Sequence, residues 1–427
     1  MPLFSKKLYT RESSKASRLW LLLAAFLSVF SITATAHAAT YYVSTSGSDS
    51  GNGSEASPFK TIQHAVGIMV AGDTTYVKGG VYNEQSVTFK KSGTQDAHIK
   101  LLAAPGEKPV IDFESSGGRI TFLNGKTDDV KEIGYIDLEG FEIRNSPAGI
   151  QFFNTHDVTI RNNYIHDIDG QGLLGMGKNM LIDSNTLSNI GGRCIDGRAE
   201  FHPDRTCNQY HGMYLTGTNW VITNNVIANS LASGIQVAGY PWCPPPQECY
   251  GGGWKTKHDE SYAGAAGWLI ANNTIANNGG PGITVWQKDA HNIDIVNNIF
   301  YENATSAPNG SYQGISFYGS GGDNSVKNNM FFATGAGGTS AIGGGTNWQS
   351  KYTESGNINA DPMFVNPDTG NFGLEAGSPA IGAGIDIGLG TNIGASGSGG
   401  FVTLPPGRPS GGSGGAGGGG GLGSCYK

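Results

Sequence analysis

Charged residues and helix-favouring runs are scarce in this sequence. Charged residues make up only 14% of its 427 residues, whereas glycine, with 68 copies, is the commonest residue. A chain that is rich in Gly and Asn and poor in charge favours turns and short strands over long helices. The composition therefore indicates an all-β protein, with enough residues for one large domain or two ordinary ones.

The first 38 residues differ in composition from the rest of the chain. They contain a basic leader made of Lys6, Lys7, Arg11, Lys15 and Arg18. The apolar run that follows, residues 19–33, is too short for a typical membrane span, and Ala36-His37-Ala38 fits a small-x-small cleavage site. We expect residues 1–38 to be a signal peptide and the mature protein to be secreted, to the periplasm, the cell surface or the medium.

The mature chain is acidic. Removing residues 1–38 takes away five basic residues and one acidic residue, which leaves 22 basic and 33 acidic residues and a net charge of about −11. This surplus argues against nucleic acid as a partner. An anionic polysaccharide would need a local basic patch or a bound cation. We expect a monomer that binds no nucleic acid and has no transmembrane segment.

The five cysteines are few and mostly local. Cys194 and Cys207 bracket one irregular stretch, and Cys243 and Cys249 bracket another. In an exported protein such local pairs predict disulfides that staple loops. A zinc site is the weaker alternative, because neither pair has a matching His pair at zinc spacing. Cys425 is left over near the C-terminus.

A short motif recurs along the chain, in which two β-type runs flank Asn or Asn-Asn. The residues at the second Asn position are read as Gly140, Asn163, Asn185, Asn225, Asn273, Asn298 and Asn329. Their successive intervals are 23, 22, 40, 48, 25 and 31 residues. A basal period of 22–25 residues predicts a coil of three strands and three turns, with the Asn side chains stacked in an internal ladder. A leucine-rich repeat has a similar period, but its Leu and Asn pattern is absent.

A third strand follows the Asn motif in most coils, and its alternation predicts three columns of side chains. The inward column is Ile150, Leu173, Met213, Ile235, Ile283 and Ile315. The first outward column is Gln151, Leu174, Tyr214, Gln236, Thr284 and Ser316. The second outward column is Phe153, Met176, Thr216, Ala238, Trp286 and Tyr318. Outward aromatic rings suit sugar stacking, and packing under loops is the equally open alternative.

The two ends of the repeat need caps, because an open coil exposes strand edges and core. Ser57-Pro58 resembles a helix start, and apolar residues at helical spacing (62, 65, 66 and 69) follow. We expect a short capping helix there and an early strand over residues 74–81. Residues 395–427 are rich in Gly, Ser and Pro, which predicts a flexible tail without a packed core.

Three stretches resemble the right-handed parallel β-helix superfamily, which includes pectate lyase-like proteins. They are the segments at 41–66 and 72–84, the Asn-rich coils, and the segment ADPMFVNPDTGNFGLEAGSPAIGAG at 360–384. The resemblance implies an all-β, single-stranded right-handed parallel β-helix over residues 39–394. Members of this superfamily include polysaccharide lyases, glycoside hydrolases, uronate epimerases and non-catalytic surface proteins, so fold alone does not select the activity.

Two coil intervals exceed the basal period and predict insertions at 191–210 and 240–266. The first precedes the strand at 211–216 and the second follows the strand at 233–238 on the next coil, so both flank the same strand face and are expected to wall one substrate cleft. The candidate catalytic residues there are His211, Tyr214, Arg193, Arg205, Lys255 and Lys257. The candidate substrate-binding residues are Gln236, Trp286, Lys288, Tyr318 and Trp254.

These residue types suit β-elimination on a uronate. A base must remove the proton at C5, and Tyr214, His211 or one of the two lysines can serve. Positive charge must stabilise the enediolate that develops, either from the arginines or from a bound Ca²⁺. No column of Asp or Glu is clear enough to name a calcium site.

Two other functions fit the same residues. A glycoside hydrolase would use two carboxylates, for which Asp196, Asp204, Asp259 and Glu260 are available. A non-catalytic carbohydrate-binding or surface protein would need the aromatic residues but no base, and the Gly-rich tail suits attachment. The sequence therefore predicts a polysaccharide-acting protein, with a lyase ranked first.

Overall fold

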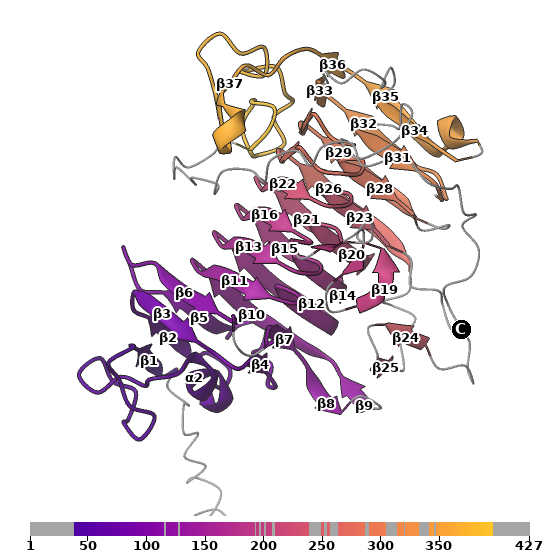
Figure 1. Ribbon diagram of the computed structural model, residues 1–427. Coiled ribbons are helices and arrows are strands. Elements are labelled where there is room, and N and C mark those ends of the chain that lie inside the picture. Colours follow the sequence, from indigo (N-terminus) through magenta and orange to yellow (C-terminus); the bar gives the residue numbers. More distant parts are fainter. Residues whose placement is uncertain are drawn as a thin grey trace, which may run out of the picture. The chain divides into compact units, whose positions relative to one another are not determined.

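The structure is a computed structural model, whose parts are shown in Figure 1. It describes residues 38–114, 117–126, 129–192, 194–195, 198–199, 202–206, 210–238, 249–251, 254–256, 264–286, 290–304, 314–319, 321–332, 341–345 and 347–395. The predicted signal peptide and the predicted tail lie outside these residues, apart from Ala38 and Ala395. None of the helices in this described part is long and apolar enough to cross a membrane.

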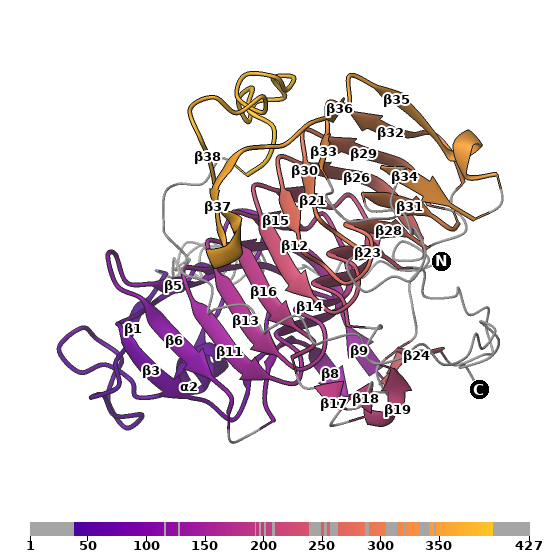
Figure 2. The same cartoon turned by 45° about the horizontal axis from the view of Figure 1, so that its top comes forward.

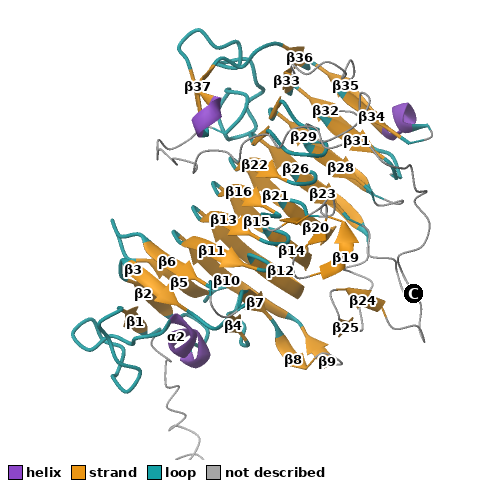
Figure 3. Ribbon diagram, in the orientation of Figure 1, coloured by secondary structure: helices purple, strands orange, loops and turns teal. Residues whose placement is uncertain are grey.

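Among the described residues, the strands form three parallel rows that run from coil to coil (Figures 1 and 3). The β3–β36 row is β3 Gly80–Asn83, β6 Pro109–Asp112, β11 Glu142–Ser146, β13 Tyr164–Ile168, β16 Thr186–Ile190, β22 Val226–Ser230, β27 Thr274–Ala276, β30 Ile299–Tyr301, β33 Met330–Phe332 and β36 Ile358–Asn359. The β4–β34 row is β4 Val87–Phe89, β7 Ile120–Phe122, the start of β12 Ile150–Arg161, β14 Leu173–Lys178, β20 Met213–Thr218, β23 Ile235–Val237, β28 Ile283–Val285, β31 Ile315–Phe317 and β34 Ile342–Gly344. The β1–β35 row is β1 Thr40–Val43, β2 Thr74–Val77, β5 Ile99–Ala103, β10 Ile133–Glu139, the end of β12, β15 Leu181–Asp183, β21 Val221–Thr223, β26 Ala265–Ala271, β29 His291–Val296, β32 Asn324–Lys327 and β35 Tyr352–Ser355.

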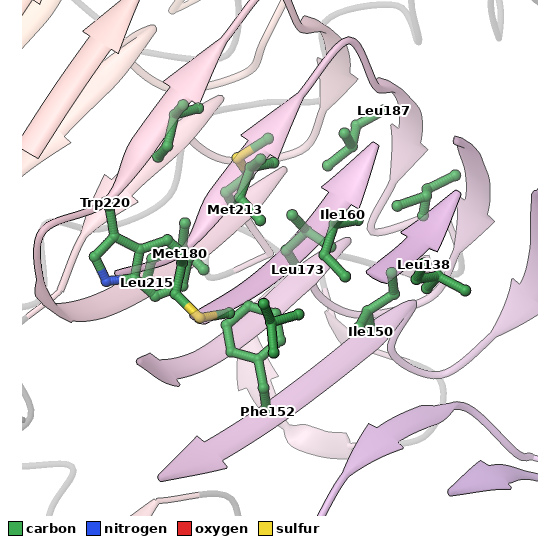
Figure 4. Close-up of a cluster of buried hydrophobic side chains, with 14 of the residues drawn as sticks. Leu138, Ile150, Phe152, Ile160, Leu173, Met180, Leu187, Met213, Leu215 and Trp220 are labelled. Atoms are coloured by element: carbon green, nitrogen blue, oxygen red, sulfur yellow. The ribbon is translucent and has the colours of Figure 1, made fainter. Parts of the chain in front are cut away.

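This arrangement is a parallel β-helix, as the repeat predicted. Most coils contribute one strand to each row, and Figure 2 shows the rows stacked along the chain. The predicted inward column is confirmed, because Ile150, Leu173 and Met213 lie in register on neighbouring strands and are fully buried. Figure 4 shows these side chains converging with Leu215 and Trp220 in the interior between the rows.

The predicted Asn ladder is confirmed in the turn that follows the β1–β35 row. Asn185 donates its backbone N–H (2.9 Å) and its Nδ2 (3.0 Å) to Oδ1 of Asn225, and the same pair of bonds links Asn225 to Asn273. Each amide also donates to a carbonyl of the preceding coil, such as Asn225 Nδ2 to Ile182 O at 2.9 Å. The stacked amides thereby satisfy one another and the backbone groups of the neighbouring turns.

One ladder position was predicted one residue too early. Leu138 pairs with Ile160, so Gly140 corresponds to Asn162 and Phe141 corresponds to Asn163. The Phe141 N–H donates to Asn163 Oδ1 at 3.0 Å, and its ring is buried where the other coils place an amide. Gly140 instead shares the left-handed backbone of Asn162, with φ of 90° and 55°, respectively.

Two expectations near the N-terminus need correction. The helix is α2, Ile62–Ile68, and its N-cap is Thr61 and not Ser57, because Phe59 still forms a bridge to Val43. Thr61 Oγ1 accepts the His64 N–H at 3.2 Å, as an N-cap does. The single strand expected over 74–81 is two strands, β2 and β3, which belong to different rows. Burial of Ile62 and Val66 packs α2 against the first strands, and its role as a cap stays a prediction.

The C-terminal segment covers part of the β3–β36 row. After β37 Phe364–Asn366, the 3₁₀ turn η4 Pro367–Thr369 and β38 Asn371–Leu374, the chain returns along the coils. Phe372 and Ile393 pack on Ile299 in a separate apolar cluster. Asn297 Nδ2 donates to Ile385 O at 2.8 Å, which ties the segment to the Asn turns.

Candidate functional site

The candidate site lies on the outer face of β14, β20 and β23. Leu173, Met213 and Ile235 point inward in register, so Leu174, Tyr214 and Gln236 occupy neighbouring outward positions. All three outward side chains are half-buried. Adjacent parallel strands lie about 4.8 Å apart, so Tyr214 and Gln236 are close enough for one ligand to contact both.

A glycine precedes the inward residue on each of β12, β14, β20, β23, β28 and β31 and sets the spacing of the face. A Cβ atom on Gly212 would lie 2.6 Å from the carbonyl oxygen of Gly234, and one on Gly234 would lie 2.9 Å from that of Gly282. Neither distance is tolerated by real side chains, so only glycine lets the coils approach this closely. Because Gly212 is needed for this close approach, the preceding residue, His211, is held at the edge of the face, two residues before β20.

His211 is buried, with 7% of its surface exposed, and forms a defined hydrogen bond. Its Nδ1 accepts the backbone N–H of Ser233 at 3.1 Å, which assigns the ring proton to Nε2. Burial lowers the pKa of His211 to about 3. The imidazole is therefore neutral at neutral pH and suits hydrogen-bond donation through Nε2 better than strong base catalysis. Its ring centroid lies 5.5 Å from that of Tyr214.

A cation that the sequence did not single out lies at the N-terminal side of this face. Arg119, directly before β7, donates from Nη1 to Oε1 of Gln151 at 3.1 Å. Burial lowers the pKa of Arg119, but a guanidinium stays charged at any ordinary pH. Gln151 lies two strands from Tyr214, a separation of about 10 Å. Only the strand register, and no local motif, brings Arg119 to this face.

The second outward column divides into a covered part and an open part. Phe153, Met176, Thr216 and Ala238 are buried. Trp286 and Tyr318, which follow β28 and β31, are 45% and 47% exposed. Their ring centroids are 4.9 Å apart and their planes are tilted by 49°. The column is thus aromatic and accessible only toward the C-terminal coils.

Both predicted insertions carry short antiparallel strands. The first holds β17 Cys194–Ile195, β18 Arg198–Ala199 and β19 His202–Thr206, and the second holds β24 Cys249–Gly251 and β25 Trp254–Thr256. β25 lies against β9 Asp129–Lys131, which pairs with β8 Asn124–Lys126 in a hairpin that the sequence did not predict (Figure 1).

None of the predicted residues in the two insertions has a described side chain, and neither has Lys288. Arg193, Lys257, Lys288, Cys207 and Cys243 lie outside the described residues. For Arg205, Lys255, Trp254, Cys194 and Cys249 only the backbone is described. Their catalytic, binding and disulfide roles therefore stay predictions.

The described residues do not fit a calcium cage. None of them form a group of three or more His, Cys, Asp or Glu side chains placed to hold a metal ion. Calcium prefers six to eight oxygen ligands. The calcium dependence, for which the sequence named no ligands, stays a prediction.

Comparisons with known proteins agree with this fold. Residues 41–200 match the family model described as "Pel9A-like, right handed beta helix region", and residues 258–353 match the one described as "Right handed beta helix region". Pectate lyase PEL9 of Emericella nidulans is 33% identical over 177 residues, which cover 38% of this chain and 43% of that protein. The uncharacterized protein YwoF of Bacillus subtilis is 38% identical over 74 residues, which cover 17% of this chain and 16% of that protein.

The chain thus matches less than half of the length of these curated relatives. A solved structure titled "Rhamnogalacturonan lyase" superposes with a TM-score of 0.51 at 17% identity, over 79% of this chain and 95% of that one. At this identity the likeness concerns the fold alone.

Proposed function

Since the chain belongs to the right-handed parallel β-helix superfamily, we propose that it is an exported enzyme that cleaves a uronate-containing polysaccharide by β-elimination. The proposal rests on one observation above all. Tyr214 and Gln236 are neighbours on a half-buried face whose rim holds the neutral His211, and both insertions adjoin this face. The partial match to a pectate lyase supports the same reaction class.

The reaction assigns a role to each of these groups. Tyr214, or Lys255 or Lys257 from the second insertion, takes the proton at C5 of the uronate. The electron pair forms the C4–C5 double bond, the glycosidic oxygen leaves C4, and that oxygen takes up a proton. The Gln236 amide and the His211 Nε2–H donate hydrogen bonds to the uronate carboxylate. Arg193 or Arg205 from the first insertion neutralises the negative charge that grows on this carboxylate.

The test follows absorbance near 235 nm, where the unsaturated uronate absorbs, during incubation with pectate, alginate or glycosaminoglycans. We expect a rise with one polymer class. With Tyr214 as the base, Tyr214→Phe should lose kcat by about 100-fold or more, whereas an unchanged kcat would assign the base to Lys255 or Lys257. Tyr76→Phe, a half-buried tyrosine on the first coils, is the matched control and should keep the wild-type rate. Repeating the assay with calcium and then with chelator tests the predicted metal dependence.

A flat trace with every polymer would contradict the lyase. Release of reducing ends without the absorbance would then indicate a hydrolase, which needs two carboxylates about 5–10 Å apart. The outward columns of the β4–β34 row contain no carboxylate at the positions from Gln151 to Tyr318. Binding without either product would indicate a carbohydrate-binding protein.

A further inference from the structure

Along the coils of the β4–β34 row, the solvent-exposed side chains move from the first outward column to the second. On β14, β20 and β23 the first outward column is half-open, at Leu174, Tyr214 and Gln236. On β28 and β31 that column closes, because Thr284 is 4% exposed and Ser316 is fully buried. The second column opens at the same coils, where it holds the two exposed aromatic rings.

The two rings form a continuous apolar surface. Val285 pairs with Phe317 in register, so Trp286 and Tyr318 are direct neighbours on adjacent coils. Each anchors its backbone to the previous coil, with Trp286 N–H donating to Val237 O and Tyr318 N–H to Val285 O, both at 3.0 Å. The side chains are thus held by rigid strand ends although almost half of each is accessible.

Small residues lie on both sides of the pair in the same column. Ala238 precedes Trp286 on β23's coil, and Gly345 follows Tyr318 on β34's coil. A Cβ atom on Gly345 would be in ordinary contact with Tyr318, 3.8 Å from its Cδ1, so the glycine itself leaves this side of the ring uncovered. Neither neighbour has a side chain long enough to cover the rings.

We propose that Trp286 and Tyr318 form a stacking subsite for the C–H face of a pyranose, and that the polysaccharide crosses the coils from Tyr214 to Tyr318 along the axis of the β-helix. This proposal rests on the proposed function, because it takes Tyr214 and Gln236 as the reacting end. Aromatic faces bind the apolar face of a sugar whether or not the ring bears a carboxylate. The subsite therefore adds affinity for chain length and does not select the uronate.

The dimensions suit a polymer and exclude a monosaccharide. Tyr214 and Tyr318 are three coils apart, about 14 Å along the axis, and two residues along the strand add a sideways shift of about 7 Å. One sugar cannot contact both ends of this path. An oligosaccharide that lies diagonally across β20, β23, β28 and β31 contacts the polar pair and both rings.

The experiment measures binding separately from turnover, by affinity electrophoresis through gels that contain polygalacturonate, alginate or hyaluronate. We expect at least one polymer to retard the wild type and Trp286→Ala or Tyr318→Ala to weaken that affinity about 10-fold each. Tyr76→Ala removes a half-buried ring that packs on Tyr42 on the first coils, and it should be retarded like the wild type. Thermal unfolding of each variant reports whether the fold is intact.

Unchanged retardation of the folded Trp286→Ala and Tyr318→Ala variants would overturn the subsite, and so would a wild type that no polymer retards. If Trp286→Ala fails to fold, Tyr318→Ala decides by the same outcomes. Retardation that depends on the rings without any rise near 235 nm would contradict the lyase and support the subsite. A rise near 235 nm with ring-independent retardation would contradict the subsite and support the lyase.

Discussion

Two histidines on different faces of this β-helix are buried to the same 7% and have opposite surroundings. His211, on the candidate site, accepts a backbone N–H and faces no carboxylate within hydrogen-bond distance among the described residues. His166, on the β3–β36 row, lies with Nδ1 2.7 Å from Asp167 and Nε2 3.2 Å from Glu142. An imidazolium can donate to both carboxylates at once, whereas a neutral ring can donate to only one.

The charged surroundings of His166 extend over neighbouring coils. Arg144 donates from Nε to Asp112 at 2.8 Å and from Nη1 to Glu142 at 2.9 Å. Burial raises the pKa of Asp112, but hydrogen bonds from Asn145 and Arg144 outweigh it and hold that pKa below its ordinary value. At equal exposure the two histidines therefore differ in their partners: His166 lies among charged side chains, whereas burial without a described carboxylate partner keeps His211 neutral.

The largest loss of stability should come from disrupting the Asn ladder in the interior of the β-helix, which both faces share. In Asn225→Ala the Asn185 N–H and the Ile182 carbonyl lose buried partners, so we expect a destabilisation of about 3–5 kcal/mol. Urea unfolding measures it. Asn162→Gly is the matched control, because glycine adopts its left-handed backbone without strain, and it should cost less than about 1 kcal/mol. Similar losses in both variants would contradict the ladder's role.

The sequence predicted the parts of the fold that repeat from coil to coil better than the parts that occur once. The inward column and the Asn ladder recur with the coil, so their periodicity identifies them without any contact information. The misplacement at Gly140 arose because Gly140-Phe141 replaces the Asn pair there and nothing local marks the register. The helix start was misplaced because Ser57-Pro58 has cap chemistry, whereas pairing with the first strand keeps Phe59 extended.

The candidate site was only partly predictable for the same reason. Its outward columns repeat, so Tyr214 and Gln236 were correctly brought together. Arg119 and the network of Asp112, Glu142 and Arg144 were missed, because these side chains meet across coils whose spacing departs from the period. No local sequence signal joins residues that only the strand register makes neighbours.

The neutral His211 should make the stability of the protein depend on pH. His211 has a folded pKa of about 3, below its unfolded value of 6.5, so the unfolded state binds a proton that the folded state excludes. Stability should fall by about 2–4 kcal/mol as the pH decreases from 6.5 toward 3. In His211→Gln, whose amide oxygen can still accept the Ser233 N–H, this dependence should flatten. An unchanged slope would show that His211 is protonated in the folded state.

The smallest effect is expected at His166, where the acid response belongs to the carboxylates. The hydrogen bond from His166 lowers the pKa of Asp167, so Asp167 stabilises the fold above its ordinary pKa and loses that contribution as the pH falls through its lowered folded pKa. His166→Gln should destabilise the protein by at most about 1 kcal/mol at pH 7, because the Asp167 side chain is 44% exposed and solvent screens its charge, and it should reduce the further loss below about pH 4. Denaturant unfolding at both pH values checks this. A loss below about pH 4 that is as large in His166→Gln as in the wild type would contradict this role of His166.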